Sequence, residues 1–458
     1  MGILLLGISI LFIPDRAVVQ AKKVEDETSL KVLATTLREG KAKQALTLYG
    51  KMPESSQKSA ALSALCGLAL LDCGEFEMAR QKFEIACKIH PRCPEAKLGL
   101  GELEMSLLRW PEALSLLQQA QGTDLLLFRA GIALSQCFME LRQRKEALNV
   151  LQHLLKSTGS LNDREVEGLM RRIGYLEALD KLGNADIYVM DNVALKTLLS
   201  FTALDGHIII PATLNGLQVK CHVDTGNNSG LAVDEKTAAA LKIEAIAEGK
   251  TAGVGGESVG KIGLIRDFQV GESTIRHVPV SLATSCLGGA SDANIGLAIL
   301  RRFNISIDYK NKQLFFFHLS QSPDQSSITA RLSSVIPFWI KPLIVIRAKI
   351  NGGPEIPCIF DTGAGIPVID KGYYSETLQK GEKSAFITKE NRGMPYLIKT
   401  LELGGLTFRN IFSAILDLTP VYETGSFYFP AIVGASVLQN SLIRIDFKNM
   451  RLTIEMHD

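Results

Sequence analysis

The chain has 458 residues, which is enough for two to four domains rather than a single hydrophobic core. Hydrophobic residues make up 46% of it and charged residues 21%, a balance that excludes an intrinsically disordered protein. Fifty basic and forty-eight acidic side chains give a net charge of +2, so we expect no nucleic acid as a partner. The sequence has no Walker or GxGxxG loop, no HExxH and no CxxC pair, so we expect neither a metal nor another cofactor.

Residues 1–21 have the pattern of an export signal. An apolar run from Ile3 to Ile13 is too short to span a bilayer but typical of a signal peptide, and Val19-Gln20-Ala21 offers small residues at the usual cleavage spacing. No Lys or Arg precedes the run, so a buried N-terminal helix is the alternative. We expect a signal peptide or N-terminal anchor, and hence a periplasmic or other extracytoplasmic protein that contacts a membrane at most through this segment.

From about Ser29 to Lys156 the sequence repeats with a period of 34 residues. Small residues at a fixed helical spacing let two helices approach closely, and a large apolar residue four positions later fills the groove between them. The small residues are Ala45, Ala79, Ala113 and Ala147, followed by Tyr49, Phe83, Leu117 and Leu151. The pattern predicts pairs of packed helices.

This period resembles the tetratricopeptide repeat, best seen from Cys66 to Pro91. The resemblance implies an all-α solenoid over residues 29–160, with a face for a protein partner. A packing or spacer role is the alternative. We expect residues 161–202 to form a helical cap or connector, with helices over 165–182 and 192–199.

After Thr202 the pattern changes to short alternating apolar runs separated by Gly, Asn and Pro, which predicts β-structure. The same signals then occur twice in the same order: an apolar strand, an Asp-Thr-Gly triplet, an apolar-Gly pair about 70 residues later, and a tail that aligns without a gap. The matching positions are Asp224 with Asp361, Gly296 with Gly434, and Leu300–Leu314 with Leu438–Leu452. This half of the chain is therefore a tandem duplication.

The doubled pattern resembles the retropepsin-like aspartic proteases, in which a strand delivers Asp-Thr-Gly to the interface of two lobes and the apolar-Gly segment runs behind that loop. The resemblance implies two all-β lobes that form a pseudo-dimer. They would cover residues 203–318 and 335–458, with a polar linker at 319–334. It also implies an aspartic endopeptidase whose substrate is a protein or peptide.

The chemistry explains why two copies are needed. Peptide hydrolysis of this kind needs one carboxylate to activate water and one carboxylic acid to protonate the carbonyl oxygen. Two carboxyl groups about 3 Å apart cannot both ionise, so they share one proton. Asp224 and Asp361 are therefore the candidate catalytic pair. By resemblance, threonines bond across the two-fold axis and glycines turn the chain where a side chain would collide. These supporting residues are Thr225, Gly226, Thr362 and Gly363.

A glycine-rich stretch at 251–260 lies where the family carries a flap that covers the substrate. Its candidate residues are Gly253, Gly255 and Gly256. The second copy has only Gly393 near the equivalent place, so we expect one flap, from the first lobe. A mobile loop without a covering role is the alternative.

Some residues near the motifs depart from the family or recur without an obvious catalytic role. Asn227 follows the first triplet where the family prefers a small residue, so it either hydrogen-bonds the outer carboxylate oxygen or crowds the site. Asp308 and Asp446 precede Lys-Asn and are predicted to be turn residues. Cys221 and Cys358 are predicted to be core residues, with a disulfide between them as the alternative.

Two other functions fit the same sequence. Asn227 and the glycine-poor second copy fit a non-catalytic peptide-binding or scaffold protein with degenerate lobes. Alternatively, an active site forms only between identical lobes of two chains, and activity would then follow the concentration of a dimer.

Overall fold

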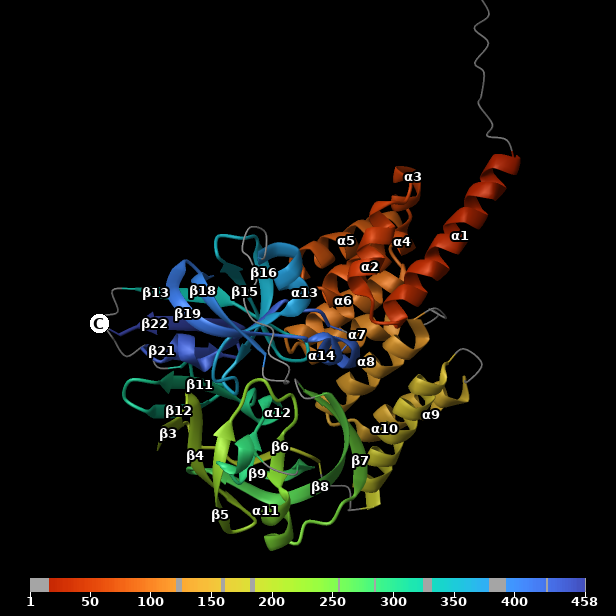
Figure 1. Ribbon diagram of the computed structural model, residues 1–458. Helices are drawn as coiled ribbons and strands as arrows, with labels where there is room; N and C mark the ends of the chain where they lie inside the picture. The colour runs from red at the N-terminus through yellow and green to blue at the C-terminus, as the bar shows by residue number, and fades with distance from the viewer. Residues whose placement is uncertain are drawn as a thin grey trace, which may run out of the picture.

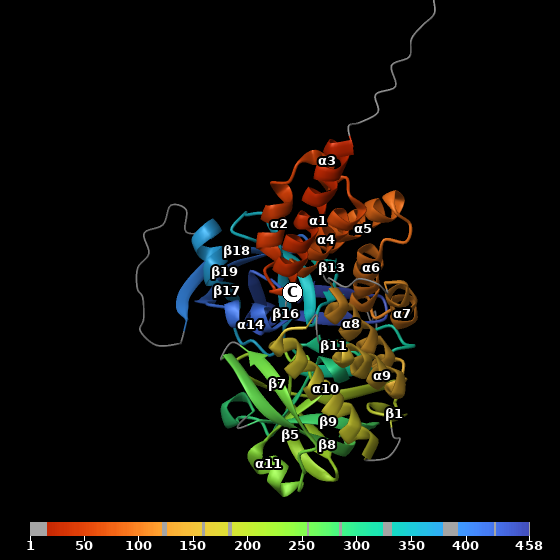
Figure 2. The ribbon, with the colours of Figure 1, turned by 90° about the vertical axis from the view of Figure 1, so that its right-hand side faces the viewer.

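The computed structural model describes residues 16–120, 126–157, 161–181, 186–253, 256–283, 286–323, 332–378, 393–425 and 427–457. A helical unit comes first and two β-rich lobes follow it (Figure 1). The helical unit extends along both lobes, with its first helices beside the second lobe and its last helix beside the first lobe (Figures 1 and 2).

The helical unit is built from consecutive packed helices, as the 34-residue period predicts. Its helices are α1 (Arg16–Arg38), α2 (Ala42–Gly50), α3 (Glu54–Gln57), α4 (Ala60–Asp72), α5 (Phe76–Ile89), α6 (Pro94–Ser106), α7 (Trp110–Gln119), α8 (Leu127–Glu140), α9 (Arg144–Lys156) and α10 (Asp163–Lys181). Helices α4 and α5, α6 and α7, and α8 and α9 pack as pairs. A Cβ on Gly67 would collide with the ring of Phe83, which explains the small residue at this helix contact. The helical region is confirmed, while its assignment to the tetratricopeptide family stays a prediction.

The predicted signal segment lies mostly outside the described residues, the first of which is Arg16 of α1. Among the helices that are described, none is both long enough and apolar enough to cross a membrane. Export therefore stays a prediction.

The predicted connector is wrong in its second half. The helix expected over 192–199 is replaced by a strand, β2 (Lys196–Ser200), which pairs antiparallel with β12 (Gln313–His318). Exposed side chains alternate with less exposed ones along β2, and Thr197 is buried. The exposure therefore repeats every two residues, as in a strand, and not every 3.6 residues, as in a helix.

Strand β2 belongs to the duplicated unit. In the second lobe β13 (Ser333–Pro337) pairs with β22 (Arg451–Met456) just as β2 pairs with β12. An edge-on aromatic pair follows in each copy, with ring centroids 6.1 Å apart in the first lobe and 5.7 Å apart in the second. These pairs are Phe201 with Tyr309 and Phe338 with Phe447. The first lobe therefore begins before residue 203, with β1 (Val189–Asn192), which pairs with β9 (Ser273–Ala283).

Lobe one is a twisted sheet with strand order β1-β9-β6-β10-β5-β4-β8-β7, and β3 pairs with β4. Its strands are β1 (Val189–Asn192), β3 (Thr202–Leu204), β4 (His207–Leu214), β5 (Leu217–Val223), β6 (Leu231–Asp234), β7 (Ala247–Gly253), β8 (Gly256–Val270), β9 (Ser273–Ala283) and β10 (Ala293–Ile295). The short helices α11 (Glu235–Ala240) and α12 (Leu297–Leu300) complete it.

Lobe two repeats this plan with strand order β14-β15-β16-β20-β17-β19-β18. Its strands are β14 (Trp339–Ile340), β15 (Ile344–Ile350), β16 (Glu355–Asp361), β17 (Val368–Asp370), β18 (Met394–Leu403), β19 (Leu406–Leu416) and β20 (Ala431–Gly434). Its helices are α13 (Lys371–Tyr373) and α14 (Thr419–Gly425).

A third, six-stranded sheet joins the lobes in the order β13-β22-β21-β11-β12-β2. At its centre β11 (Phe303–Asp308) pairs antiparallel with β21 (Ser441–Asp446). The register places Ile305 opposite Ile445 and Ile307 opposite Ile443, although the sequence duplication relates Ile305 to Ile443. Such crossed pairing is what a two-fold axis between the two strands produces. The lobes therefore form a pseudo-dimer within one chain.

The helical unit is docked on lobe two by an apolar contact. Trp339 of β14 stacks on Phe76 of α5, with ring centroids 4.7 Å apart. Val345 and Ile359 of lobe two are fully buried in the same hydrophobic cluster as the helices α4 and α5. Burial of this kind fixes the helical unit against the lobe.

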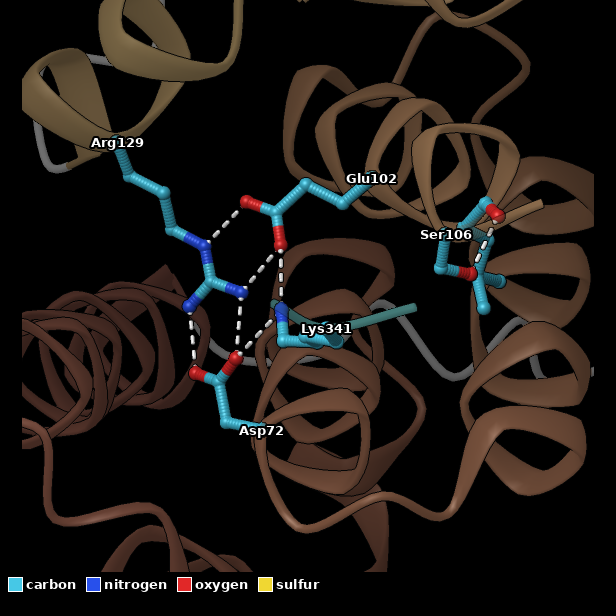
Figure 3. Close-up of polar contacts among 6 residues, drawn as sticks. Asp72, Glu102, Ser106, Arg129 and Lys341 are labelled. Carbon is cyan, nitrogen blue, oxygen red and sulfur yellow. Dashed lines mark hydrogen bonds and ion pairs between the residues drawn. The ribbon is translucent and has the colours of Figure 1, made fainter. Parts of the chain in front are cut away.

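An ionic cluster adjoins this contact (Figure 3). Arg129 lies 2.6 Å from Asp72 and 2.5 Å from Glu102, and Lys341 of lobe two reaches the same two carboxylates at 3.1 and 3.0 Å. Burial alone would raise the pKa of Glu102, but the two cations together lower it to about 2. Two positive and two negative charges thus compensate each other at the interface.

Candidate active site

Two strands deliver the Asp-Thr-Gly loops to the junction of the lobes. Strand β5 ends at Val223, immediately before Asp224, and β16 ends at Asp361. Each strand has a short parallel neighbour, β10 beside β5 and β20 beside β16, and buried apolar side chains hold both pairs. The duplicated strands thus bring equivalent loops from both lobes together.

The threonines of the two loops bond to each other across the pseudo-two-fold axis. The Thr225 hydroxyl donates to the carbonyl of Phe360 at 2.9 Å and accepts from the amide of Thr362 at 3.0 Å. The Thr362 hydroxyl donates to the carbonyl of Val223 at 2.9 Å and accepts from the amide of Thr225 at 3.1 Å. Both side chains are buried. Each hydroxyl therefore has its partners only when the opposite loop is in place.

The carboxyl groups of Asp224 and Asp361 lie over the glycines of the opposite loops. A Cβ on Gly226 would collide with the carboxyl group of Asp361, and a Cβ on Gly363 would collide with that of Asp224. Each glycine amide also donates to the Oδ1 of its own aspartate, at 2.8 Å in the first loop and 2.7 Å in the second. Only glycine fits at either position because the opposite carboxyl group occupies the space of a side chain.

The two carboxyl groups are electrostatically coupled. Burial raises the pKa of Asp361 well above its ordinary value, and the nearby charge of Asp224 raises it further, while the amide of Gly363 opposes the shift. Two neighbouring carboxyl groups that are shielded from water avoid the repulsion of two negative charges by sharing one proton. Asp361 therefore stays protonated at a pH where an isolated aspartate is ionised.

The apolar-Gly segments run directly behind the two loops, as the sequence predicts. A Cβ on Gly296 would collide with the carbonyls of Asn227 and Ser229, and a Cβ on Gly434 would collide with those of Ile366 and Ala364. The amide that follows each glycine donates to the loop, to Asn227 at 2.6 Å in lobe one and to Ala364 at 2.7 Å in lobe two. These bonds fix the back of each loop.

The glycine-rich stretch of lobe one forms a hairpin of β7 and β8. Gly253 pairs with Gly256 at its end, and Gly255 lies outside the described residues. The base of the hairpin packs on the last helices of the helical unit through Ile246 and Leu264, and its strands contact α14 of lobe two. The hairpin of lobe one therefore contacts the helical unit and lobe two, while its role as a substrate cover stays a prediction.

Asn294 is a site residue that the sequence analysis missed. Its Nδ2 donates to Oδ2 of Asp224 at 2.7 Å. The side-chain amide of Asn227 bonds Asn294 instead of the carboxylate, with its Nδ2 donating to Oδ1 of Asn294 at 2.9 Å. The sequence feature that could have pointed to Asn294 is a difference between the two copies, because Asn294 corresponds to Ile432 in the second copy.

The other recurring residues serve the fold. Asp308 and Asp446 each accept two hydrogen bonds from an asparagine three residues later, as predicted for turn residues. Cys221 and Cys358 are fully buried and free, which confirms their core role and shows that the disulfide alternative is wrong. Burial raises the pKa of both thiols. Within the described residues, no group of three or more His, Cys, Asp or Glu side chains is arranged to hold a metal ion.

Part of lobe one matches a known protein family. Residues 210–299, which include Asp224 and Asn294, match the family model described as aspartyl protease. A solved structure similar to this chain is the aspartic proteinase from Irpex lacteus, at 14% identity and a TM-score of 0.40, covering 57% of this chain and 98% of that one. No curated protein matches the sequence. Lobe one thus matches the aspartyl protease family over residues 210–299, and lobe two repeats its Asp-Thr-Gly loop.

Proposed function

We propose that the protein is an aspartic endopeptidase, in which the carboxyl groups of Asp224 and Asp361 together catalyse the hydrolysis of a peptide bond in the substrate. The observation that carries the proposal is the pairing of two carboxyl groups over the opposite loop glycines, within one chain. The raised pKa of Asp361 supports it, because an acid must stay protonated beside an ionised carboxylate.

In the proposed reaction the pair holds one proton and one negative charge. The ionised carboxylate takes a proton from a water molecule as that water attacks the peptide carbonyl carbon, and the protonated carboxyl group donates to the carbonyl oxygen. Proton transfer to the leaving nitrogen then breaks the C–N bond. The buried threonine bonds hold both carboxyl groups in place during these steps.

The β7–β8 hairpin is the proposed substrate cover. Its position against α14 of lobe two supports this role, because a hairpin that contacts both lobes lies across their junction. Peptide substrates would then bind between the hairpin and the aspartates.

The helical unit is proposed to fix the two lobes relative to each other. Its contacts with lobe two through Trp339 and Lys341, and with the base of the hairpin through Ile246, support this packing role. A protein partner on its remaining surface, and export through residues 1–21, are proposals that rest on the sequence patterns alone.

The test is cleavage of an unfolded protein substrate by the full chain between pH 3 and 8. Asp224→Asn and Asp361→Asn should each abolish cleavage, whereas Asp446→Asn, at a turn of lobe two, should retain it. Cleavage that survives both active-site substitutions would refute the mechanism.

Two further outcomes identify the alternatives. Binding of peptides or of a pepstatin-type inhibitor without turnover at any pH would indicate a non-catalytic binding protein. Activity that rises with dimer concentration in sedimentation experiments would indicate a site formed between chains, whereas the pairing within this chain predicts an active monomer.

A further inference from the structure

In lobe one, hydrogen-bonded polar side chains lie beside the aspartate, whereas the matching positions of lobe two are apolar. Asn294 lies on β10 and His222 on the neighbouring strand β5, where the two residues are paired in register. Their counterparts in lobe two are Ile432 and Ile359, which pack against the helical unit. The two carboxyl groups thus have unlike surroundings: Asp224 accepts a side-chain hydrogen bond from Asn294, and the matching positions beside the second aspartate are apolar.

The orientation of the Asn294 amide is fixed by its neighbours. The backbone amide of Ser229 can only donate, and it donates to Oδ1 of Asn227 at 2.9 Å. The Nδ2 of Asn227 must therefore point the other way, and it donates to Oδ1 of Asn294 at 2.9 Å. This leaves the Nδ2 of Asn294 facing Oδ2 of Asp224 at 2.7 Å. This series of hydrogen bonds, which starts at the backbone amide of Ser229, thus directs an N–H donor of Asn294 at the carboxylate of Asp224.

His222 supports the same orientation from the other side. Its Nδ1 lies 3.4 Å from the Nδ2 of Asn294 and its Nε2 lies 3.3 Å from Nδ1 of His207. Burial lowers the pKa of His222 to about 4, the charge of Asp224 opposes this shift, and His207 adds to it. A neutral ring with its proton on Nε2 donates toward His207 and accepts from Asn294 through Nδ1, whereas a protonated ring would present an N–H group to the N–H₂ group of Asn294.

We propose that Asn294 is a positioning residue that keeps Asp224 as the ionised member of the pair, so that Asp361 holds the shared proton. A donor to the charged form stabilises that form, and Asp224 receives one from Asn294, whereas the matching residue beside Asp361 is the apolar Ile432. For its catalytic consequence the inference rests on the proposed function: Asp224 accepts the proton of the attacking water, and Asp361 donates to the carbonyl oxygen.

The first test reads the charge of each aspartate without any turnover. A small epoxide alkylates an ionised carboxylate, a diazoacetyl ester alkylates a protonated carboxyl group, and peptide mass spectrometry locates each new ester. We expect the epoxide on Asp224 and the diazo reagent on Asp361. In Asn294→Leu the preference of the epoxide for Asp224 should fall about tenfold or more, which corresponds to the loss of one charge-assisted hydrogen bond.

Ile432→Leu is the matched control, since it introduces the same side chain at the equivalent place in lobe two, and it should keep the preference. Equal labelling of both aspartates in the wild type would overturn the inference, as would an unchanged preference in Asn294→Leu. If Asn294→Leu does not fold, the inference about Asn294 is still tested by the labelling pattern of the wild type and by that of Asn294→Thr, which keeps a donor.

The second test is the pH profile of kcat/KM for peptide cleavage. Loss of the donor should move the acid limb of the profile to higher pH by about one unit and lower kcat with little change in KM, and Asn294→Thr should restore part of both. A residue with a merely structural role would lower activity without moving the limb. Selective labelling without turnover would refute the proposed function and leave the inference about Asn294 standing. Turnover with unselective labelling would support the proposed function and overturn the inference.

Discussion

The threonines of the two loops make the site depend on both lobes at once. Each hydroxyl satisfies one carbonyl and one amide of the opposite loop, and all of these groups are buried. A buried backbone group without a partner costs about 1–3 kcal/mol, so the loops stabilise each other only as a pair.

Thr362→Val should lower the free energy of unfolding by about 2–4 kcal/mol, because it leaves the carbonyl of Val223 and the amide of Thr225 without partners. Thr362→Ser keeps the hydroxyl and should cost about 1 kcal/mol, the value of a buried methyl group. Urea unfolding of both variants tests the difference. Equal losses would show that the hydroxyl bonds contribute nothing.

His222 should make the protein less stable in acid. The folded protein resists protonation of this ring down to about pH 4, whereas the unfolded chain takes up the proton near 6.5. The unfolded state therefore binds more protons in this interval, and the stability falls by up to about 3 kcal/mol as the pH drops from 6.5 to 4. The measurement is urea unfolding at several pH values, compared with His222→Gln. A variant with the same pH dependence as the wild type would contradict the assignment.

The residues of the site differ in how far the sequence revealed them. Asp224 and Asp361 could be predicted because the duplication marks both, and the chemistry requires two carboxyl groups. Asn294 could not, because a single polar residue in a short apolar strand has no pattern of its own. Its role becomes visible only when the strand is seen beside β5, where it comes within reach of Asp224.

Among the elements, β2 shows where the sequence analysis stopped short. The apolar residues at its ends recur in the second copy at a spacing of 137, the same spacing as the aspartates. They are Leu195 and Phe201, matched by Leu332 and Phe338. The strand is only five residues long and its partner β12 lies more than a hundred residues later, so local periodicity did not distinguish it from a helix.

Phe201→Ala should destabilise the protein by about 3–5 kcal/mol, because the ring directly follows β2 and is buried against Tyr309. Phe338→Ala, at the equivalent joint of lobe two, should cost a similar amount. Leu198→Ala on β2 is the control, since that side chain is 51% exposed and should cost below about 1 kcal/mol. Thermal or urea unfolding gives the three values, and a small effect of Phe201→Ala would place β2 outside the cooperative unit.

For the whole molecule, the helical unit is the part whose placement the sequence could not predict. The repeat period predicts packed helices, but nothing periodic links Asp72, Glu102 and Arg129 to Lys341, which comes from the other half of the chain. The cluster therefore depends on the packing of the two parts against each other. Part of the surface that could have held a separate partner is occupied by the chain's own second lobe.

Lys341→Met should weaken this docking, because it leaves two buried carboxylates with the single cation Arg129, at a cost of about 3 kcal/mol. The fluorescence of Trp339, which stacks on Phe76 at this interface, should then change at lower urea concentration than in the wild type. Lys349→Met, an exposed lysine on β15, is the matched control. Coincident transitions in all three proteins would show that the ionic cluster does not hold the interface.

The sharing of one proton by two carboxyl groups is tested most directly by carboxyl ¹³C NMR of aspartate-labelled protein between pH 3 and 8, with Asp224→Asn and Asp361→Asn used for assignment. We expect the Asp361 resonance to titrate well above the ordinary range of an aspartate, and its midpoint to fall in Asp224→Asn, where the neighbouring charge is gone. Two independent titrations near the ordinary value, each unaffected by substitution of the other residue, would contradict it.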